Sequence, residues 1–465
     1  MRMINFLFVG VAVLCATAAS AARYSWAPAL TSGEAGGDAP WGRVHFDPNN
    51  SNVMWAATTQ VPDPFATEPL PDGNGLWKST DGGRSWSQMA SGALDPTLNI
   101  LDFSISKSNS DVVYVATLEG GVLKTINGGS TWTAINQGLG LPHAKNGAGA
   151  VVVDPTNSDN VYVSVGQLNG IQILSPSPDH PGFFYSHDGG ATWIANNSGL
   201  PNRSDAFLDL VSNTSVPVSL VIPDDQPETI YAGILTAEAN GKVFLGKKAI
   251  ADTQVFRNTT SGTGTWSPIS DGLKSVVTND SGIGSLLRFS VTGVILSSVT
   301  VSGRHVLYMS NLAAGGEVDL GGEDATKLKS QGIWLLAPGS TTWLERNTGL
   351  PVVNDAENDN AINSCPVGTV PGDPYTALTG VLDSDGTLAG STKIWATATA
   401  GDPWMMNWGD SGLDNSPTLG LPYCNAIFIE VAPNGRRAIA SVAWDGEGSS
   451  LNDDDGVYMV PPPSQ

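Results

Sequence analysis

Residues 79–86 read Ser-Thr-Asp-Gly-Gly-Arg-Ser-Trp, and the same pattern returns twice with the same spacing. Residues 125–132 read TINGGSTW, residues 186–193 read SHDGGATW, and degenerate copies end at Trp266 and Trp343. A hydroxyl, an Asp or Asn, a glycine and a tryptophan at fixed offsets indicate a tight turn that recurs along the chain. The sequence is therefore interpreted first as a set of repeats.

Each copy lies in a longer unit of short strands. Around the first copy, alternating or β-rich runs at 42–48, 52–57, 75–79 and 86–89 are separated by Asp, Asn, Pro and Gly. Four such strands with regular turns are typical of one propeller blade. The second-strand pattern recurs seven times, beginning at Asn52, Asp111, Asn160, Thr229, His305, Lys393 and Arg437. We expect an all-β, single seven-bladed β-propeller of four-stranded antiparallel blades.

The two ends of the chain are expected to complete one blade. The last unit stops after a third strand at 456–460, and the segment 22–33 contains Ser25-Trp26, which resembles Ser85-Trp86. The N-terminal strand is thus predicted to close the ring, which removes open sheet edges.

In the sixth unit, a first strand is expected from Tyr375, a second from Lys393 and a third at 403–407.

The first 21 residues have the pattern of a secretory signal peptide. Arg2 precedes a short apolar run, and Ala19-Ser20-Ala21 is a small-residue cleavage site. Residues 22–465 are expected to form the propeller, secreted and extracellular, with no membrane span. The formal net charge of −22 disfavours nucleic acid and anionic membranes as partners. It suits neutral sugars or basic partners, although it also simply keeps a secreted protein soluble.

The turns at Asp81, Asn127 and Asp188 resemble the Asp-box, or BNR, repeat, and Gly199-Leu200-Pro201 is similar to a segment of the same superfamily. The resemblance implies a propeller like those of sialidases, xyloglucan hydrolases and photosystem II assembly factors, and it is nearly silent on activity. The Asp or Asn is expected to bind its own turn and the Trp to pack between blades. The segment around Arg43 lacks the sialidase pattern, and arginines are sparse, so a sialidase is not expected.

Function is expected on the face that carries the long links between strands. That face is rich in acids and aromatic residues, which suits sugar binding, and a suitably spaced pair of carboxylates would permit glycoside hydrolysis. Solvated loop acids are the alternative interpretation of each one. The candidate catalytic residues are Asp205, Asp209, Asp355, Asp373, Asp445 and Glu447.

Two further features of this face carry specific predictions. Cys365 and Cys424 are expected to form a disulfide in an oxidising compartment, with two free buried thiols as the alternative. Asp453, Asp454 and Asp455 are candidate calcium ligands because of their density of oxygen atoms. No cofactor is required by any motif.

Two functions remain open from the sequence. The first is a secreted monomeric propeller that binds or hydrolyses a neutral polysaccharide through its acidic long-loop face. The second is a non-catalytic propeller that binds an extracellular protein through the same face. If the chain is an enzyme, a glycoside hydrolase is expected.

Overall fold

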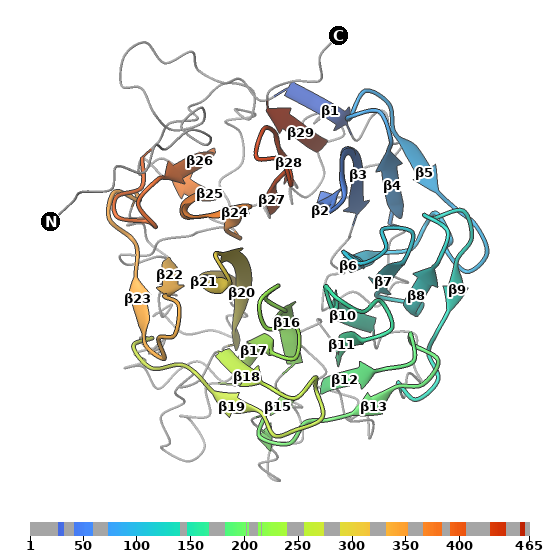
Figure 1. Cartoon of the computed structure of the whole chain (residues 1–465), viewed down its shortest axis with the longest axis horizontal. Helices are drawn as coiled ribbons and strands as arrows, with labels where there is room; N and C mark the ends of the chain where they lie inside the picture. Colours follow the sequence, from blue (N-terminus) through green and yellow to red (C-terminus); the bar gives the residue numbers. More distant parts are fainter. Residues whose placement is uncertain are drawn as a thin grey trace, which may run out of the picture.

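The computed structural model is a ring of antiparallel sheets around an open centre (Figure 1). It describes residues 27–31, 41–58, 73–139, 147–166, 182–200, 202–203, 213–214, 216–239, 255–273, 289–316, 332–351, 366–383, 391–405, 428–442 and 456–460. No helix among these residues is long and apolar enough to cross a membrane. The predicted signal peptide, Cys365 and Cys424 lie outside the described residues.

Three consecutive units form separate four-stranded sheets, in which neighbouring strands pair in chain order. The first contains β2 (Trp41–Asp47), β3 (Asn50–Thr58), β4 (Leu76–Ser79) and β5 (Ser87–Met89). The second contains β6 (Ile100–Ile105), β7 (Val113–Thr117), β8 (Gly121–Thr125) and β9 (Thr133–Ala134). The third contains β10 (Gly147–Val153), β11 (Val161–Gly166), β12 (Gly182–Ser186) and β13 (Ile194–Ala195).

The next two units share one eight-stranded sheet. Its strands are β16 (Val216–Val221), β17 (Ile230–Ala239), β18 (Val255–Asn258), β19 (Ser267–Pro268), β20 (Phe289–Val301), β21 (Arg304–Gly316), β22 (Ile333–Leu336) and β23 (Trp343–Glu345). A small hairpin of β14 (Asn202–Arg203) and β15 (Asn213–Thr214) stands apart from this sheet.

The prediction of seven four-stranded blades is wrong. Apart from the small hairpin, the described strands form six sheets, because β17 continues past its own unit and pairs with β20 from Thr236↔Thr292 to Ala239↔Phe289. This pairing satisfies backbone N–H and C=O groups that two separate sheet edges would leave open. Two sequence repeats therefore merge into one sheet.

The sixth sequence unit also differs from its expected strand order. Its first strand is β24 (Gly368–Val370), so the run from Tyr375 belongs to the second strand, β25 (Asp373–Asp383). The third strand is β26 (Ser391–Thr397), and within the described part of this unit a fourth is represented by an isolated bridge between Ala396 and Met405. The run at 403–407 is therefore not a third strand. It was misassigned because β24 is short and follows a Pro-rich segment that hid its pattern.

The two ends of the chain meet in the last sheet. β1 (Ala27–Thr31) pairs with β29 (Gly456–Val460), which continues to β28 (Ala438–Val442) and β27 (Phe428–Val431). The register places Ala27 opposite Met459 and Leu30 opposite Val457. The pairing expected from the echo of the box sequence near the N-terminus is therefore present, and β1 occupies the outer edge of this sheet in Figure 1.

The hydrophobic core lies between neighbouring sheets. In one cluster, Trp55 and Leu76 from the first sheet pack against Phe103 and Val115 from the second. Trp132 joins them, and its ring lies edge-on to that of Trp55 with the centroids 6.4 Å apart. Each sheet thus buries both faces against its neighbours, which accounts for the near-continuous apolar second strands.

The tryptophan that ends several of the turn motifs fastens one unit to the previous one. The indole Nε1 of Trp193 donates to the carbonyl of Ile135 at 2.6 Å, and that of Trp266 donates to Asn196 at 3.1 Å. The backbone N–H of Trp266 also donates to Ser198. Gly199 follows immediately, with φ +89°, and an added Cβ there would lie 2.2 Å from the Trp266 carbonyl oxygen. The Gly-Leu segment is therefore the docking surface for the next tryptophan.

The same interaction identifies a turn motif that the sequence did not reveal. Trp404 donates through Nε1 to Arg346 at 2.7 Å and through its backbone N–H to Thr348. The hydroxyl of Thr397 accepts the N–H of Gly401 at 2.9 Å, as Ser79 accepts that of Gly83. Residues 397–404, TATAGDPW, are thus a degenerate copy of the motif in which the Asp is replaced by threonine.

Candidate functional site

We call the turns at 79–86, 125–132 and 186–193 the box turns, and the side of the ring on which they lie the box face. Asp188 accepts the N–H of Thr192 at 2.9 Å and the hydroxyls of Thr192 and Ser186 at 2.6 and 2.7 Å. Asp81 makes the corresponding bonds to Ser85 and Ser79. These donors favour the ionised carboxylate, so the pKa of each Asp falls to about 2.

Asn127 occupies the same position in the second box turn. Its Oδ1 accepts the N–H of Thr131 at 2.9 Å, and its Nδ2 donates to the Thr131 hydroxyl at the same distance. An amide can therefore replace the carboxylate, because a hydroxyl can donate or accept. The Thr192 hydroxyl donates to Asp188, whereas the Thr131 hydroxyl accepts from Asn127. The box turns are built from their own hydrogen bonds, and their acids are occupied with them.

This equivalence gives a stability prediction. Asp188→Asn should change the free energy of unfolding by less than about 0.5 kcal/mol, because Asn127 already shows a working amide in this turn. Asp188→Ala should cost about 1 kcal/mol, because it leaves the Thr192 N–H without its acceptor. Urea unfolding of both variants measures the difference. Equal losses for Asn and Ala would contradict this role.

The lowered pKa values also predict acid sensitivity with a defined sign. The stabilisation from Asp81 and Asp188 is fully present above the unfolded carboxyl pKa near 3.8 and is lost as the pH falls toward about 2. The Asp81→Asn/Asp188→Asn double variant should therefore lose less stability than the wild type between pH 4 and pH 2. Thermal unfolding midpoints across this range test the prediction. The same decrease of the midpoint with falling pH in both proteins would refute it.

The structure places one of the candidate catalytic acids. Asp373 begins β25 in the hairpin after β24, where its Oδ1 accepts the N–H of Tyr375 at 2.9 Å and its Oδ2 accepts the hydroxyl of Thr376 at 2.7 Å. The neighbouring Tyr375 carbonyl accepts the N–H of Ala400 in the turn before Trp404. Asp373 thus lies on the box face and not on the long-link face expected from the sequence. The other candidate acids and calcium ligands lie outside the described residues: Asp205, Asp209, Asp355, Asp445, Glu447, Asp453, Asp454 and Asp455.

A cavity of about 360 Å³ lies in the centre of the ring, where the first strand of each unit exposes its inner edge. Residues of β2, β6, β10, β16, β20, β24 and β27 line it. Side chains close part of these edges: Asp102 accepts the N–H of Val151 at 3.0 Å, and the hydroxyl of Ser219 accepts that of Leu296, also at 3.0 Å. The cavity wall therefore combines apolar side chains with backbone groups that are partly satisfied by side chains.

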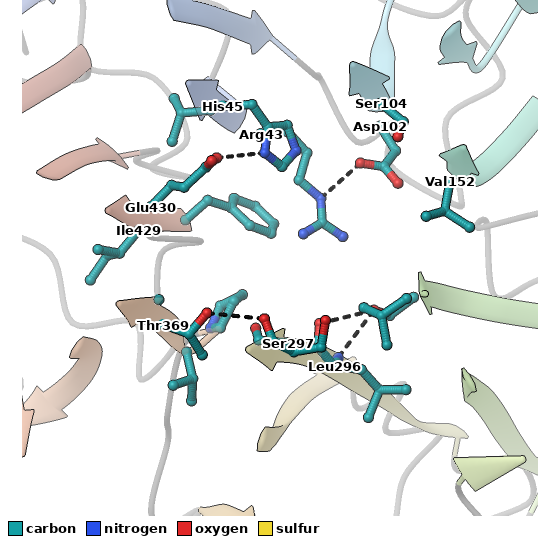
Figure 2. Close-up of a pocket in the computed structure, with 18 of the residues that line it drawn as sticks. Arg43, His45, Asp102, Ser104, Val152, Leu296, Ser297, Thr369, Ile429 and Glu430 are labelled. Carbon is teal, nitrogen blue, oxygen red and sulfur yellow. Dashed lines mark hydrogen bonds and ion pairs between the residues drawn. The ribbon is translucent and has the colours of Figure 1, made fainter. Parts of the chain in front are cut away.

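Two ion pairs cross the wall between neighbouring sheets (Figure 2). The Nε of Arg43 lies 3.2 Å from Oδ1 of Asp102, and Nδ1 of His45 lies 2.6 Å from Oε2 of Glu430. The side chains of the first pair are 16% and 11% exposed, so they are largely desolvated. Arg43 also lies over the ring of Phe428, 4.4 Å from its centroid. Three sheets thus fix the position of this one arginine.

We call this cavity the channel site. Sequence reasoning did not find it, because its charged residues lie on strands far apart in the chain, with His45 and Glu430 separated by 385 positions. The available signal was alternation. Arg43 and His45 stand two residues apart on β2, as Asp102 and Ser104 do on β6, and residues at this spacing share a face of a strand. Within the described residues, no cluster of His, Cys, Asp or Glu is arranged to hold a metal ion.

No family model and no curated protein sequence matches this chain. Among solved structures, it is similar to the GH74 xyloglucanase from Xanthomonas campestris, with 16% identity and a TM-score of 0.53. The match covers 90% of this chain and 54% of that enzyme, so the chain spans about half of the enzyme's length. At this identity the likeness shows the β-propeller fold, which confirms the resemblance to Asp-box propellers at that level.

Two further likenesses are weaker. YCF48 bound to D1 peptide has 10% identity, a TM-score of 0.46 and coverage of 94% of both chains. YCF48 from Cyanidioschyzon merolae has 12% identity, a TM-score of 0.43 and coverage of 94% of this chain and 98% of that one.

Proposed function

We propose that this chain is a secreted, monomeric propeller that binds a neutral polysaccharide on the face opposite the box turns. The observation that carries the proposal is the use of acids on the box face. Asp81, Asp188 and Asp373 are occupied by hydrogen bonds within their own turns, so a ligand gains little there. The long links, which lie outside the described residues, contain many of the remaining acids and aromatic residues in the sequence.

Two other features support a neutral sugar as ligand. The net charge of −22 repels polyanions, and a neutral polysaccharide avoids this repulsion. The xyloglucanase from Xanthomonas campestris shows that a propeller of this general form is used by an enzyme acting on such a polymer. Xyloglucan is therefore a reasonable first probe among neutral plant and microbial glycans.

Hydrolysis of the bound polysaccharide would require, in addition, a pair of carboxylates at the sugar. In the channel site, Asp102 is bound to Arg43 and Glu430 is bound to His45, so both carboxylates are already engaged by protein groups. Catalysis would therefore depend on acids in the long links. The candidates there are Asp205, Asp209, Asp355, Asp445 and Glu447.

The experiment measures retention on immobilised neutral polysaccharides and release of reducing sugar in parallel. The five candidates are changed singly to Asn or Gln, and Asp373→Asn on the box face is the matched control. Binding that falls about tenfold in a long-link variant but not in the control supports the proposal. Loss of reducing-sugar release by a factor of about 10³ in one variant would identify a catalytic acid. Neither retention nor release with any glycan would refute polysaccharide recognition.

One observation favours the second function, a protein-binding propeller. Ile126 and Tyr375 are 68% and 61% exposed, and both lie on the box face. The two residues belong to different units, so each is a separate exposed apolar side chain of the kind that can anchor a docked protein. Under this alternative, the wild type retains no glycan but captures a protein partner. Ile126→Ser should abolish that capture.

A further inference from the structure

We propose that the channel site binds one small neutral polyhydroxyl molecule, such as a monosaccharide, through the terminal guanidinium nitrogens of Arg43. The residues that line this site belong to the first strands of the units, and the inference does not depend on polysaccharide binding. Its volume of about 360 Å³ falls within the range of small-molecule sites, about 300–1,000 Å³.

The first step is the orientation of Arg43. Its Nε is bound to Asp102, whose other oxygen already accepts the N–H of Val151. The guanidinium plane rests over Phe428. With Nε and the plane both fixed, the two Nη atoms must point away from Asp102, and Figure 2 shows them directed into the open space between the strands. Among the described residues, neither Nη has a hydrogen-bond partner.

The second step is the complementary group. Glu430 reaches His45 through Oε2, and among the described residues its Oε1 accepts no hydrogen bond. The site therefore offers charged N–H donors and a carboxylate acceptor from two different sheets. A molecule with several hydroxyls satisfies both, because each hydroxyl is a donor and an acceptor. A purely apolar ligand would leave these groups unpaired.

The third step is charge. Arg43 contributes +1 and Asp102 and Glu430 contribute −2, which gives −1 with neutral His45 and 0 with protonated His45. An anionic ligand therefore meets no net positive field, despite the arginine. A cationic ligand would have to approach the guanidinium itself. The electrostatics thus favour a neutral molecule over anionic analogues of the same shape.

The test uses the full mature chain and three probes, D-xylose, D-glucose and D-glucuronate, with binding measured by calorimetry and saturation-transfer NMR. We expect saturable binding of a neutral sugar and at least about fivefold weaker binding of glucuronate. Arg43→Lys should weaken binding of the neutral sugar about tenfold, because lysine cannot hold Asp102 and present a fork at the same time. Arg437→Lys, which makes the same exchange outside the channel site, should leave binding unchanged.

A second variant keeps the test decisive if Arg43→Lys does not fold. Glu430→Gln preserves the shape and an acceptor for His45 but removes one negative charge. It should therefore reduce the ratio of the glucose affinity to the glucuronate affinity. No saturable binding of either neutral sugar, stronger binding of glucuronate than of glucose by the wild type, or an unchanged preference in Glu430→Gln would each overturn the proposal.

Discussion

Gly199→Ala is expected to lower the free energy of unfolding by about 2 to 5 kcal/mol, as the sum of two effects. Gly199 has φ +89°, which costs an L-residue about 1–2 kcal/mol. The new Cβ would also lie 2.2 Å from the carbonyl oxygen of Trp266, which is backbone and is held by its own sheet. The two neighbouring units must therefore separate slightly to make room for one methyl group.

The matched control is Gly303→Ala. Gly303 also has a positive φ, +70°, but an added Cβ there meets nothing within 4 Å. It should cost only about 1–2 kcal/mol, the conformational part alone. Urea unfolding of the two variants and the wild type separates the two effects. Equal losses would mean that the Gly199 contact with Trp266 does not restrict the junction between units.

Trp404→Ala is expected to cost about 3 to 5 kcal/mol, the range for deleting a fully buried aromatic side chain. The residue is 2% exposed and lies in a cluster with Tyr308 and Leu335. The substitution also removes the Nε1–H donor to Arg346. This prediction tests whether the degenerate turn at 397–404 joins its units as strongly as the recognisable copies do.

Trp404→Phe separates packing from hydrogen bonding. Phenylalanine keeps most of the buried ring but has no N–H, so a loss of about 1–2 kcal/mol is expected. Trp266→Phe, at a buried tryptophan that makes the same contact with the previous unit, is the reference and should behave alike. A negligible cost for Trp404→Ala, measured by thermal and urea unfolding, would show that 397–404 is not an equivalent of the box turns.

The turns were readable from the sequence because their bonds are local. The hydrogen bonds of Asp81 and Asp188 reach no further than four residues along the chain. The pattern of hydroxyl, acid, glycine and tryptophan therefore includes every residue that these bonds of the turn require. Ring closure was also readable, because β1 repeats the sequence of other outer strands and β29 lacked a partner. Residues 397–404 escaped recognition because threonine and proline replace two of the motif's residues.

The number of sheets could not be read in this way. The repeat count reports how often a unit recurs, whereas a sheet is defined by which edges pair. β17 and β20 join through the ends of long strands, from Thr236 to Ala239 and from Phe289 to Thr292, and those segments carry no part of the repeated pattern. The length of a strand beyond its unit, and not its sequence pattern, decided that two repeats form one sheet.

The sequence by itself determined a propeller of recurring β units, turns that bind their own acids, and a chain whose ends meet. These follow from interactions within a few residues or from the repetition of one unit. The tertiary structure alone decided the merging of two units and the position of the channel site. Arg43 with Asp102, and His45 with Glu430, become neighbours only when the ring closes, because each pair joins different sheets. Contacts of this kind depend on the curvature of the whole ring, which no local pattern encodes.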